Sequence, residues 1–113
     1  MKNANISIIS AVRNCKDETI AFMQSLKKFK LGNLKEIILV DDGSEDETKN
    51  FLKHKSSEFK LLRNEKSQGF AFSNNSGASK ASGDWLLFLN NDLLLKQGWG
   101  VFFVNIANGS DKL

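Results

Sequence analysis

The sequence predicts an α/β domain: a parallel sheet with helices on both faces. Short runs of β-branched and other apolar residues, typical of buried strands, recur four times along the 113 residues. Segments whose apolar residues have helical spacing separate these runs. Because strand and helix alternate, we expect parallel strands joined by right-handed crossovers.

The four strands are expected at about residues 5–12, 36–41, 59–63 and 85–90. The first run reads ISIISAV and the second EIILV. Both are apolar at nearly every position, which indicates strands that are covered on both faces rather than on one.

The first two helices are expected at residues 17–30 and at about 45–54. In 17–30 an apolar residue recurs at every third position, which gives one buried stripe with charged residues opposite. Ser44 and Glu47 have the spacing of a capping box, which predicts that the second helix begins directly after Ser44.

The third helix is expected at residues 70–82, which are rich in Ala and Ser and stop at Gly83, a plausible C-terminal cap. Its small residues predict close packing on the sheet. Residues 101–106 are predicted to form a helix from the spacing of nearby apolar residues, namely Trp99, Phe102 and Ile106.

Composition narrows the class of protein. With 41% hydrophobic and 26% charged residues, the sequence is predicted to form a single domain over 1–113. The lone Cys15 excludes an internal disulfide framework and a cysteine-cluster metal site. No transmembrane segment or signal peptide is predicted, so a cytoplasmic location is expected. A net charge of only +3, spread along the chain, argues against nucleic acid as a partner.

Polar residues directly follow each predicted strand. Arg13 and Asn14 come after the first, 41–44 after the second, 63–64 after the third and 90–92 after the fourth. Since ligands of open α/β sheets bind beyond the carboxyl ends of the strands, we expect all four groups to line one edge.

Two of these groups are acidic: Asp41 with Asp42, and the run Asn90, Asn91, Asp92. Each alone is compatible with an ordinary turn. Two acidic turns at one sheet edge would form a negative pocket that is costly without a cation. A hard cation such as Mg²⁺ or Mn²⁺ fits, with a diphosphate supplying further ligands.

Several function classes are disfavoured. No GxxxxGK[ST] phosphate loop is present, and no GxGxxG follows the first strand, which argues against Walker-type and nicotinamide-binding proteins. His54 and Cys15 have no partners at a spacing that suggests nucleophilic catalysis. Asn75, within a predicted helix, is a poor helix former and therefore a candidate for a polar role at the pocket.

Taken together, these motifs resemble the family 2 glycosyltransferases, an inverting group with the GT-A fold, a Rossmann-like nucleotide-sugar-binding sheet. The resemblance lies in ISIISAVRN at 6–14, ILVDDGSEDET at 38–48, QGFAFSNNSGASKASGDW at 68–85 and LLFLNNDLLLKQGW at 86–99. The last two are similar to the rhamnosyltransferase branch of bacterial surface-polysaccharide synthesis. The resemblance implies sheet order 3-2-1-4, a nucleotide-sugar donor, a divalent cation, and a saccharide or lipid-linked acceptor.

The resemblance also implies a role for individual residues. Asp41 would face the donor base, Asp42 the base or ribose, Asn90 the ribose, and Asp92 would be the metal ligand. The remaining residues of the nucleotide site would be Ala11, Asn14, Lys66, Gly69, Phe70, Asn75 and Asn91.

Three departures from the family pattern matter. Ala11 stands where proline is usual, and Asn90 replaces the first acid of the family's DxD motif. Family members carry the catalytic base, an Asp or Glu, in the second half of the domain, and nothing after Trp99 offers a convincing candidate. The chain is therefore expected to be a donor-binding half, either a truncated piece of a longer enzyme or a module completed by another chain. Another copy could cover its open sheet edge in a homodimer.

Two functional hypotheses stay open on this basis. The first is a metal-assisted, inverting glycosyltransferase. The second is a non-catalytic nucleotide-sugar-binding or assembly module. A sugar nucleotidyltransferase is disfavoured because no glycine-rich, basic phosphate loop follows the first strand.

Overall fold

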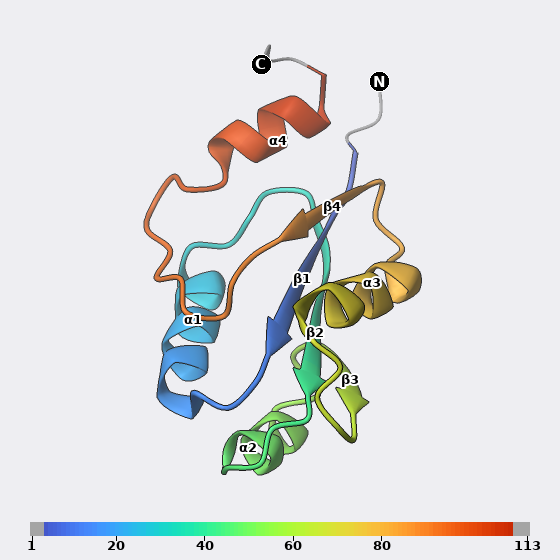
Figure 1. Cartoon of the computed structure of the whole chain (residues 1–113). Coiled ribbons are helices and arrows are strands. Elements are labelled where there is room, and N and C mark those ends of the chain that lie inside the picture. Colours follow the sequence, from blue (N-terminus) through green and yellow to red (C-terminus); the bar gives the residue numbers. More distant parts are fainter. Residues whose placement is uncertain (1–3, 110–113) are drawn as a thin grey trace.

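A computed structural model describes residues 4–109 of the chain as four strands alternating with four helices (Figure 1). In chain order the elements are β1 (Ile6–Val12), α1 (Lys16–Lys28), β2 (Leu34–Asp42), α2 (Thr48–His54), β3 (Lys60–Asn64), α3 (Phe70–Lys80), β4 (Trp85–Phe88) and α4 (Val101–Ala107).

All strand pairs are parallel, and the sheet order is β3-β2-β1-β4. The predicted α/β class and the 3-2-1-4 order are confirmed. β4 is short: Phe88 pairs with Ile9, while β1 continues to Val12. After β4 the chain makes one more backbone contact with β1, from the N–H of Leu89 to the carbonyl oxygen of Ile9, and then leaves the sheet.

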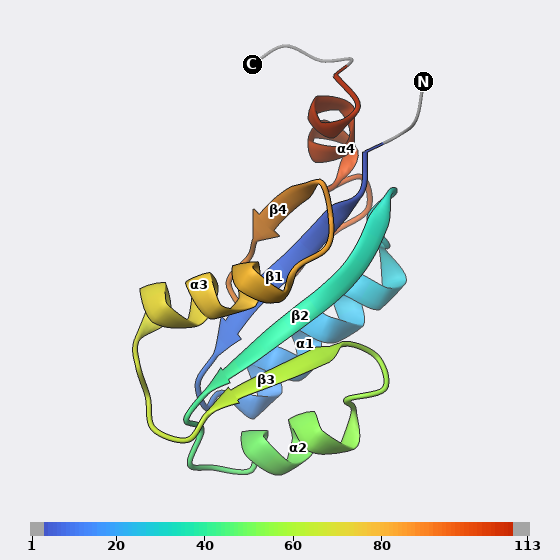
Figure 2. The ribbon, with the colours of Figure 1, turned by 90° about the vertical axis from the view of Figure 1, so that its right-hand side faces the viewer.

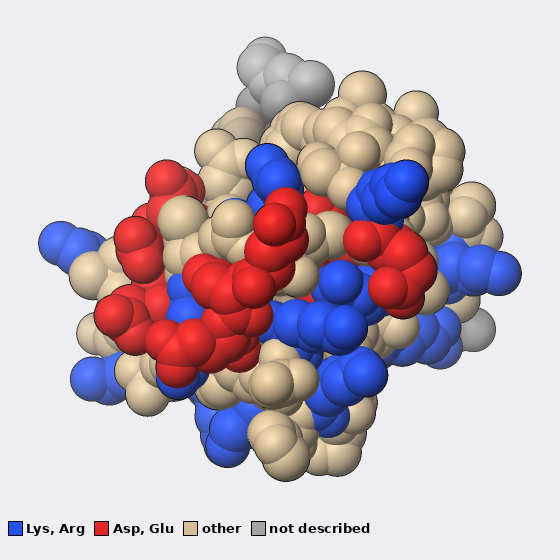
Figure 3. All heavy atoms as spheres, turned by 60° about the horizontal axis from the view of Figure 1, so that its bottom comes forward, with Lys and Arg blue, Asp and Glu red and all other residues tan. Residues whose placement is uncertain are grey.

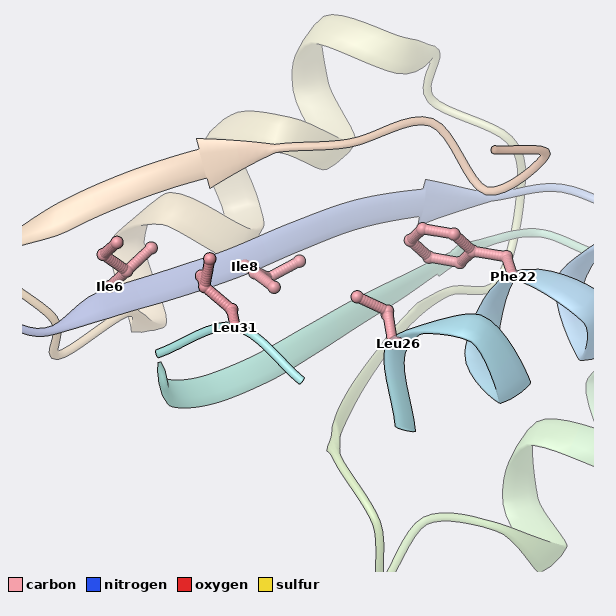
Figure 4. Packing of buried hydrophobic residues seen from close by; sticks show 5 residues of the cluster. All are labelled: Ile6, Ile8, Phe22, Leu26 and Leu31. Carbon is pink, nitrogen blue, oxygen red and sulfur yellow. The ribbon is translucent and has the colours of Figure 1, made fainter. Parts of the chain in front are cut away.

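Helices cover both faces of the sheet, as predicted. Figure 2 shows α3 on one face and α1 with α2 on the other. Ile6 and Ile8 of β1 point toward Phe22 and Leu26 of α1 and toward Leu31 (Figure 4), and all five are buried. On the opposite face, α3 packs on a second buried cluster, made of Ile9, Ile38 and Val40.

Small residues allow α3 to lie close to the sheet. Ser73 and Gly77 are its buried residues. A Cβ atom added to Gly77 would lie 2.6 Å from Cγ2 of Ile9 and 3.2 Å from Cγ2 of Val40. Any side chain at this position would therefore push α3 away from the sheet.

The start of α2 differs from the prediction. The helix begins at Thr48, and the Ser44 hydroxyl accepts a hydrogen bond from the Asn14 backbone N–H (2.9 Å) instead of capping it. Glu47 is the N-cap residue, without a side-chain capping bond, and the Asp46 side chain accepts a hydrogen bond from the backbone N–H of Thr48 (2.8 Å). Ser44 is unavailable as a cap because it ties the loops after β1 and β2 together.

The end of α3 also differs, because the helix stops at Lys80 rather than at 82. The N–H of Gly83 donates to Oγ of Ser7 (2.9 Å), so Gly83 contacts β1 instead of capping the helix. α4 confirms the predicted helix near 101–106. Within residues 4–109, no helix combines the length and apolar character needed to cross a membrane.

Candidate functional site

An open pocket of about 340 Å³ lies where the carboxyl ends of β1 and β2 meet the loops that follow β3 and β4. Five of the predicted site residues meet there, namely Ala11, Asp42, Gly69, Phe70 and Asn91. The other lining residues are Val12, Arg13 and Ser67. Three of the four predicted polar groups thus contribute to the lining, through Arg13, Asp42 and Asn91, whereas residues 63–64 lie outside it.

Asp42 fastens the rim of this pocket. Burial alone would raise the pKa of its carboxyl group, but four hydrogen bonds to the carboxylate lower that pKa to about 2. The donors are the Asn64 side-chain amide (2.9 Å), the Ser67 hydroxyl (2.9 Å), and the backbone N–H groups of Gln68 (2.7 Å) and Gly69 (3.1 Å). Asp42 therefore stays ionised and holds the loop after β3 against the end of β2.

Asp41 has a different environment because adjacent residues of a strand point to opposite faces of the sheet. It is 1% exposed and does not line the pocket. Its Oδ2 accepts from Nη1 of Arg63 (2.6 Å), and its Oδ1 accepts from the Ser44 N–H (3.0 Å). The two predicted acids are thus separated by the sheet.

Two further contacts fix the loops around the pocket. The side-chain oxygen of Asn14 accepts from the backbone N–H of Glu45 (2.9 Å). Gly43 has φ +72°, and a Cβ atom there would lie 2.6 Å from the backbone nitrogen of Ser67, so the loop after β3 crosses directly over Gly43. Asn14 and Gly43 thus position the loops around the pocket without lining it themselves.

The predicted metal motif is only partly at the pocket. Nδ2 of Asn91 donates to Oγ1 of Thr19 (2.9 Å), which holds Asn91 at the pocket wall. Asn90 and Asp92 are exposed and lie outside the lining, as do Lys66 and exposed Asn75 of α3.

The donor set can be tested against a hard cation. Among residues 4–109 no group of three or more His, Cys, Asp or Glu side chains is placed to hold a metal. The carboxylate of Asp92 and the side-chain amide oxygens of Asn90 and Asn91 are hard ligands that suit Mg²⁺ or Mn²⁺. These oxygen atoms are of the chemical type that such an ion prefers, and phosphate and water oxygens would have to complete its coordination shell.

The pocket lining carries one charge of each sign. Asp42 supplies the carboxylate, and Arg13 supplies a guanidinium that the sequence placed at this edge without giving it a role. Nη2 of Arg13 lies 3.3 Å from Oε1 of Glu45, and these side chains are 50% and 80% exposed. On the face in Figure 3, which includes the carboxyl end of the sheet, acidic and basic side chains lie side by side.

Comparison with known proteins bears on this geometry. Residues 7–100 match the family model described as Glycosyl transferase family 2. An uncharacterized glycosyltransferase of Haemophilus influenzae is 40% identical over 89 residues, which cover 77% of this chain and 29% of that protein. The Escherichia coli protein WfaP, named as a UDP-Glc:alpha-D-GlcNAc-diphosphoundecaprenol beta-1,3-glucosyltransferase, is 35% identical over 88 residues, covering 77% of this chain and 35% of WfaP.

The fold also matches solved structures. The mannosyltransferase PcManGT from Pyrobaculum calidifontis, in complex with GDP-Man and Mn²⁺, superposes with a TM-score of 0.78 at 16% identity, covering 98% of this chain and 34% of that one. The chain thus spans well under half the length of each of these proteins.

Proposed function

The chain belongs to glycosyl transferase family 2, and from this premise we propose that its pocket binds the nucleotide of a nucleotide-sugar donor whose sugar is passed to an acceptor. The observation that supports this most is the convergence of the carboxyl ends of β1 and β2 with the loops after β3 and β4 on one pocket of about 340 Å³. Ligands of open α/β sheets bind at such an edge. We propose further that the chain supplies the donor-binding part of a GT-A domain.

The finer features of the reaction are proposals too. We propose an inverting transfer, since the resemblance is to an inverting group, and a role in cell-surface polysaccharide synthesis. The name of the E. coli relative includes a diphosphoundecaprenol acceptor, which supports a lipid-linked glycan as acceptor here. The cytoplasmic location expected from the sequence stays a prediction.

The lining residues have two kinds of proposed role, direct contact with the nucleotide and support of the loop that contacts it. We propose that Ala11, Gly69, Phe70 and Asn91 contact it directly, while Asp42 acts through the loop that it holds. Asn14 and Asp41 position the strand ends from outside the pocket. The predicted roles of the remaining residues, Lys66, Asn75 and Asn90, stay predictions.

A divalent cation, Mg²⁺ or Mn²⁺, is proposed as the cofactor, and it would supply neutralisation of the departing diphosphate. Asp92 would hold it, and Asn91 at the pocket wall would bring that turn next to the phosphates. Because a single carboxylate is offered, the cation should bind weakly alone and more tightly with nucleotide. By linkage, the nucleotide gains the same factor in affinity from the cation.

Calorimetric titration of UDP and GDP, each with and without Mn²⁺, tests this proposal. We expect Mn²⁺ to strengthen binding in the wild type, and Asp92→Asn to lose that enhancement while it keeps most of its metal-free affinity. Asp17→Asn, which alters an exposed acid of α1, is the matched control. Equal affinities with and without Mn²⁺ in the wild type would contradict the metal role, and failure to bind either nucleotide would contradict the donor site.

A second candidate is a non-catalytic nucleotide-sugar-binding or assembly module. Asp42 is the one carboxylate lining the pocket within the described residues, and both of its oxygens already accept hydrogen bonds from the chain. It is therefore unsuited to be the base that deprotonates an acceptor hydroxyl. Donor hydrolysis and sugar transfer, assayed beside nucleotide binding, separate the two functions: binding without turnover favours the module.

A further inference from the structure

Arg13 is the positively charged residue of the pocket lining, and its position makes it available to a ligand. It follows β1 directly and lines the pocket together with Ser67 and Gly69 of the loop that Asp42 holds. Its side chain is 50% exposed, and it contacts Glu45 through Nη2, one of its three guanidinium nitrogens. The other nitrogens keep N–H donors that can serve an anion.

We propose that Arg13 binds the diphosphate of the nucleotide, an inference that rests on the proposed function and adds a specific phosphate ligand to it. A guanidinium matches phosphate oxygens with two parallel hydrogen bonds, which gives geometry as well as charge. The same pocket holds the ionised carboxylate of Asp42, which repels phosphates. The diphosphate is therefore directed to the Arg13 side and the nucleoside to the side of Asp42 and Gly69.

The Arg13–Glu45 ion pair does not oppose this role. Its atoms are 3.3 Å apart and its side chains are 50% and 80% exposed, and exposed pairs of this kind contribute little to stability. A diphosphate carries more charge than one carboxylate and offers a guanidinium several oxygen acceptors. It therefore competes favourably with Glu45 for the guanidinium.

The other cations near this edge are less suited to the diphosphate. Arg63 is 16% exposed and is bound to the buried carboxylate of Asp41. Lys16 pairs with Glu47 at 3.2 Å, and neither Lys16 nor Lys66 lines the pocket. Among the described residues, Arg13 is thus the one cation that lines the pocket.

The proposal is tested by calorimetry in the presence of a chelator, so that no metal bridges protein and phosphate. UDP and GDP are each compared with their nucleosides, uridine and guanosine. We expect Arg13→Ala to weaken diphosphate binding about tenfold or more and nucleoside binding less than about twofold. Arg13→Lys should fall between, because an ammonium keeps the charge and loses the paired geometry.

Two further variants sharpen the test. Lys16→Ala removes a neighbouring ion pair of similar exposure outside the pocket and should change neither affinity. Glu45→Gln removes the competing carboxylate and should raise diphosphate affinity by up to about fivefold. Unchanged thermal melting of Arg13→Ala would show that the fold is intact.

The outcomes separate the inference from the function on which it rests. Equal losses of nucleoside and diphosphate affinity in Arg13→Ala, or no loss in either, would overturn the phosphate role while leaving the donor site standing. A wild-type chain that binds none of the four ligands would overturn the proposed function and the Arg13 role together.

Discussion

Asp41 and Asp42 are consecutive in β2, yet they stabilise different parts of the molecule. Asp42 holds the loop of the pocket rim, whereas Asp41 holds Arg63 on the opposite face of the sheet. The sequence placed both at the pocket edge, which is correct for the backbone. It could not assign the two side chains to different faces, because that depends on which residues of β3, 22 positions along the chain, face each carboxylate.

The hydrogen bonds of Asp42 predict a pH-dependent stability. Its pKa is about 2 in the folded chain against 3.8 ordinarily, so between these values the unfolded chain binds more protons. Folding stability is therefore present above about pH 4 and is lost as the pH falls toward 2. The expected contribution of Asp42 is about 2 kcal/mol at neutral pH.

Urea unfolding of the wild type and Asp42→Asn at several pH values measures this contribution. Glu36, whose pKa is also lowered to about 2, affects both proteins alike, so the difference between them isolates Asp42. The difference should be largest near neutral pH and shrink between pH 4 and 2. Asp17→Asn is the surface control, and a difference that stays constant with pH would show that Asp42 is not the titrating group.

Asp41 and Arg63 are predicted to be strongly coupled. Their side chains are 2% and 16% exposed and their charged atoms lie 2.6 Å apart. Replacing Arg63 leaves the Asp41 charge buried without its ion-pair partner, and replacing Asp41 leaves Arg63 with the exposed carboxylate of Glu65, 3.6 Å away. Asp41→Asn or Arg63→Met alone should cost about 3 kcal/mol, and the double variant less than the sum. The exposed pair Lys16–Glu47 is the control cycle, with coupling under about 1 kcal/mol. Additive losses at Asp41 and Arg63 would contradict the pairing.

Elements were predicted well where a periodic pattern defines them and less well at their ends. The strand cores follow from local sequence, because burial on a sheet face imposes a period. The stripe predicted for α1 at every third residue is right only at Leu26. The buried face of α1 also contains Thr19, Phe22 and Ser25, whereas Ile20, Met23 and Phe29 are half-buried. The capping box at Ser44 failed since its hydroxyl binds the Asn14 N–H from another loop. The stop at Gly83 failed for a similar reason, a contact with Ser7 of β1. Such long-range contacts leave no local signal.

The packing of α3 predicts an unusual response to alanine. In an exposed helix interior Gly→Ala stabilises by about 1 kcal/mol, but at Gly77 the new Cβ would lie 2.6 Å from Ile9. We expect Gly77→Ala to lower the free energy of unfolding by about 1 kcal/mol and Gly77→Val by more. Ser79→Ala, on the exposed side of the same helix, should be close to neutral.

Thermal melting shows directly whether Gly77→Ala stabilises or destabilises the fold. A rise in melting temperature for Gly77→Ala would mean that α3 lies farther from the sheet than the close contact with Ile9 implies. A fall in melting temperature together with weaker UDP or GDP binding would also link α3 to the pocket, since Phe70, at the start of the same helix, lines it.

The sheet as a whole is asymmetric. β1 and β2 lie in the centre, while β3 and β4 are the two edges and each pairs with one strand within residues 4–109. Four of the five residues of β3 are half-buried. Three of the four side chains of β4 are exposed on the two faces, Trp85 at 47%, Leu86 at 41% and Phe88 at 46%. A sheet edge that offers both free backbone groups and apolar side chains is a template for pairing with another strand.

We therefore expect this chain, studied alone, to self-associate through β4. Two copies related by a two-fold axis would bring their β4 edges together antiparallel, which pairs the free backbone groups and places the apolar side chains of the two β4 strands beside one another. The double substitution of Leu86→Lys and Phe88→Lys should make the chain monomeric, because charge at an edge strand opposes pairing. Leu94→Lys, at a residue that is 66% exposed outside β4, is the control and should leave association unchanged. Light scattering across micromolar concentrations measures the mass. A monomeric wild type, or a dimer that persists in the Leu86→Lys and Phe88→Lys double variant, would show that this edge does not mediate association between copies.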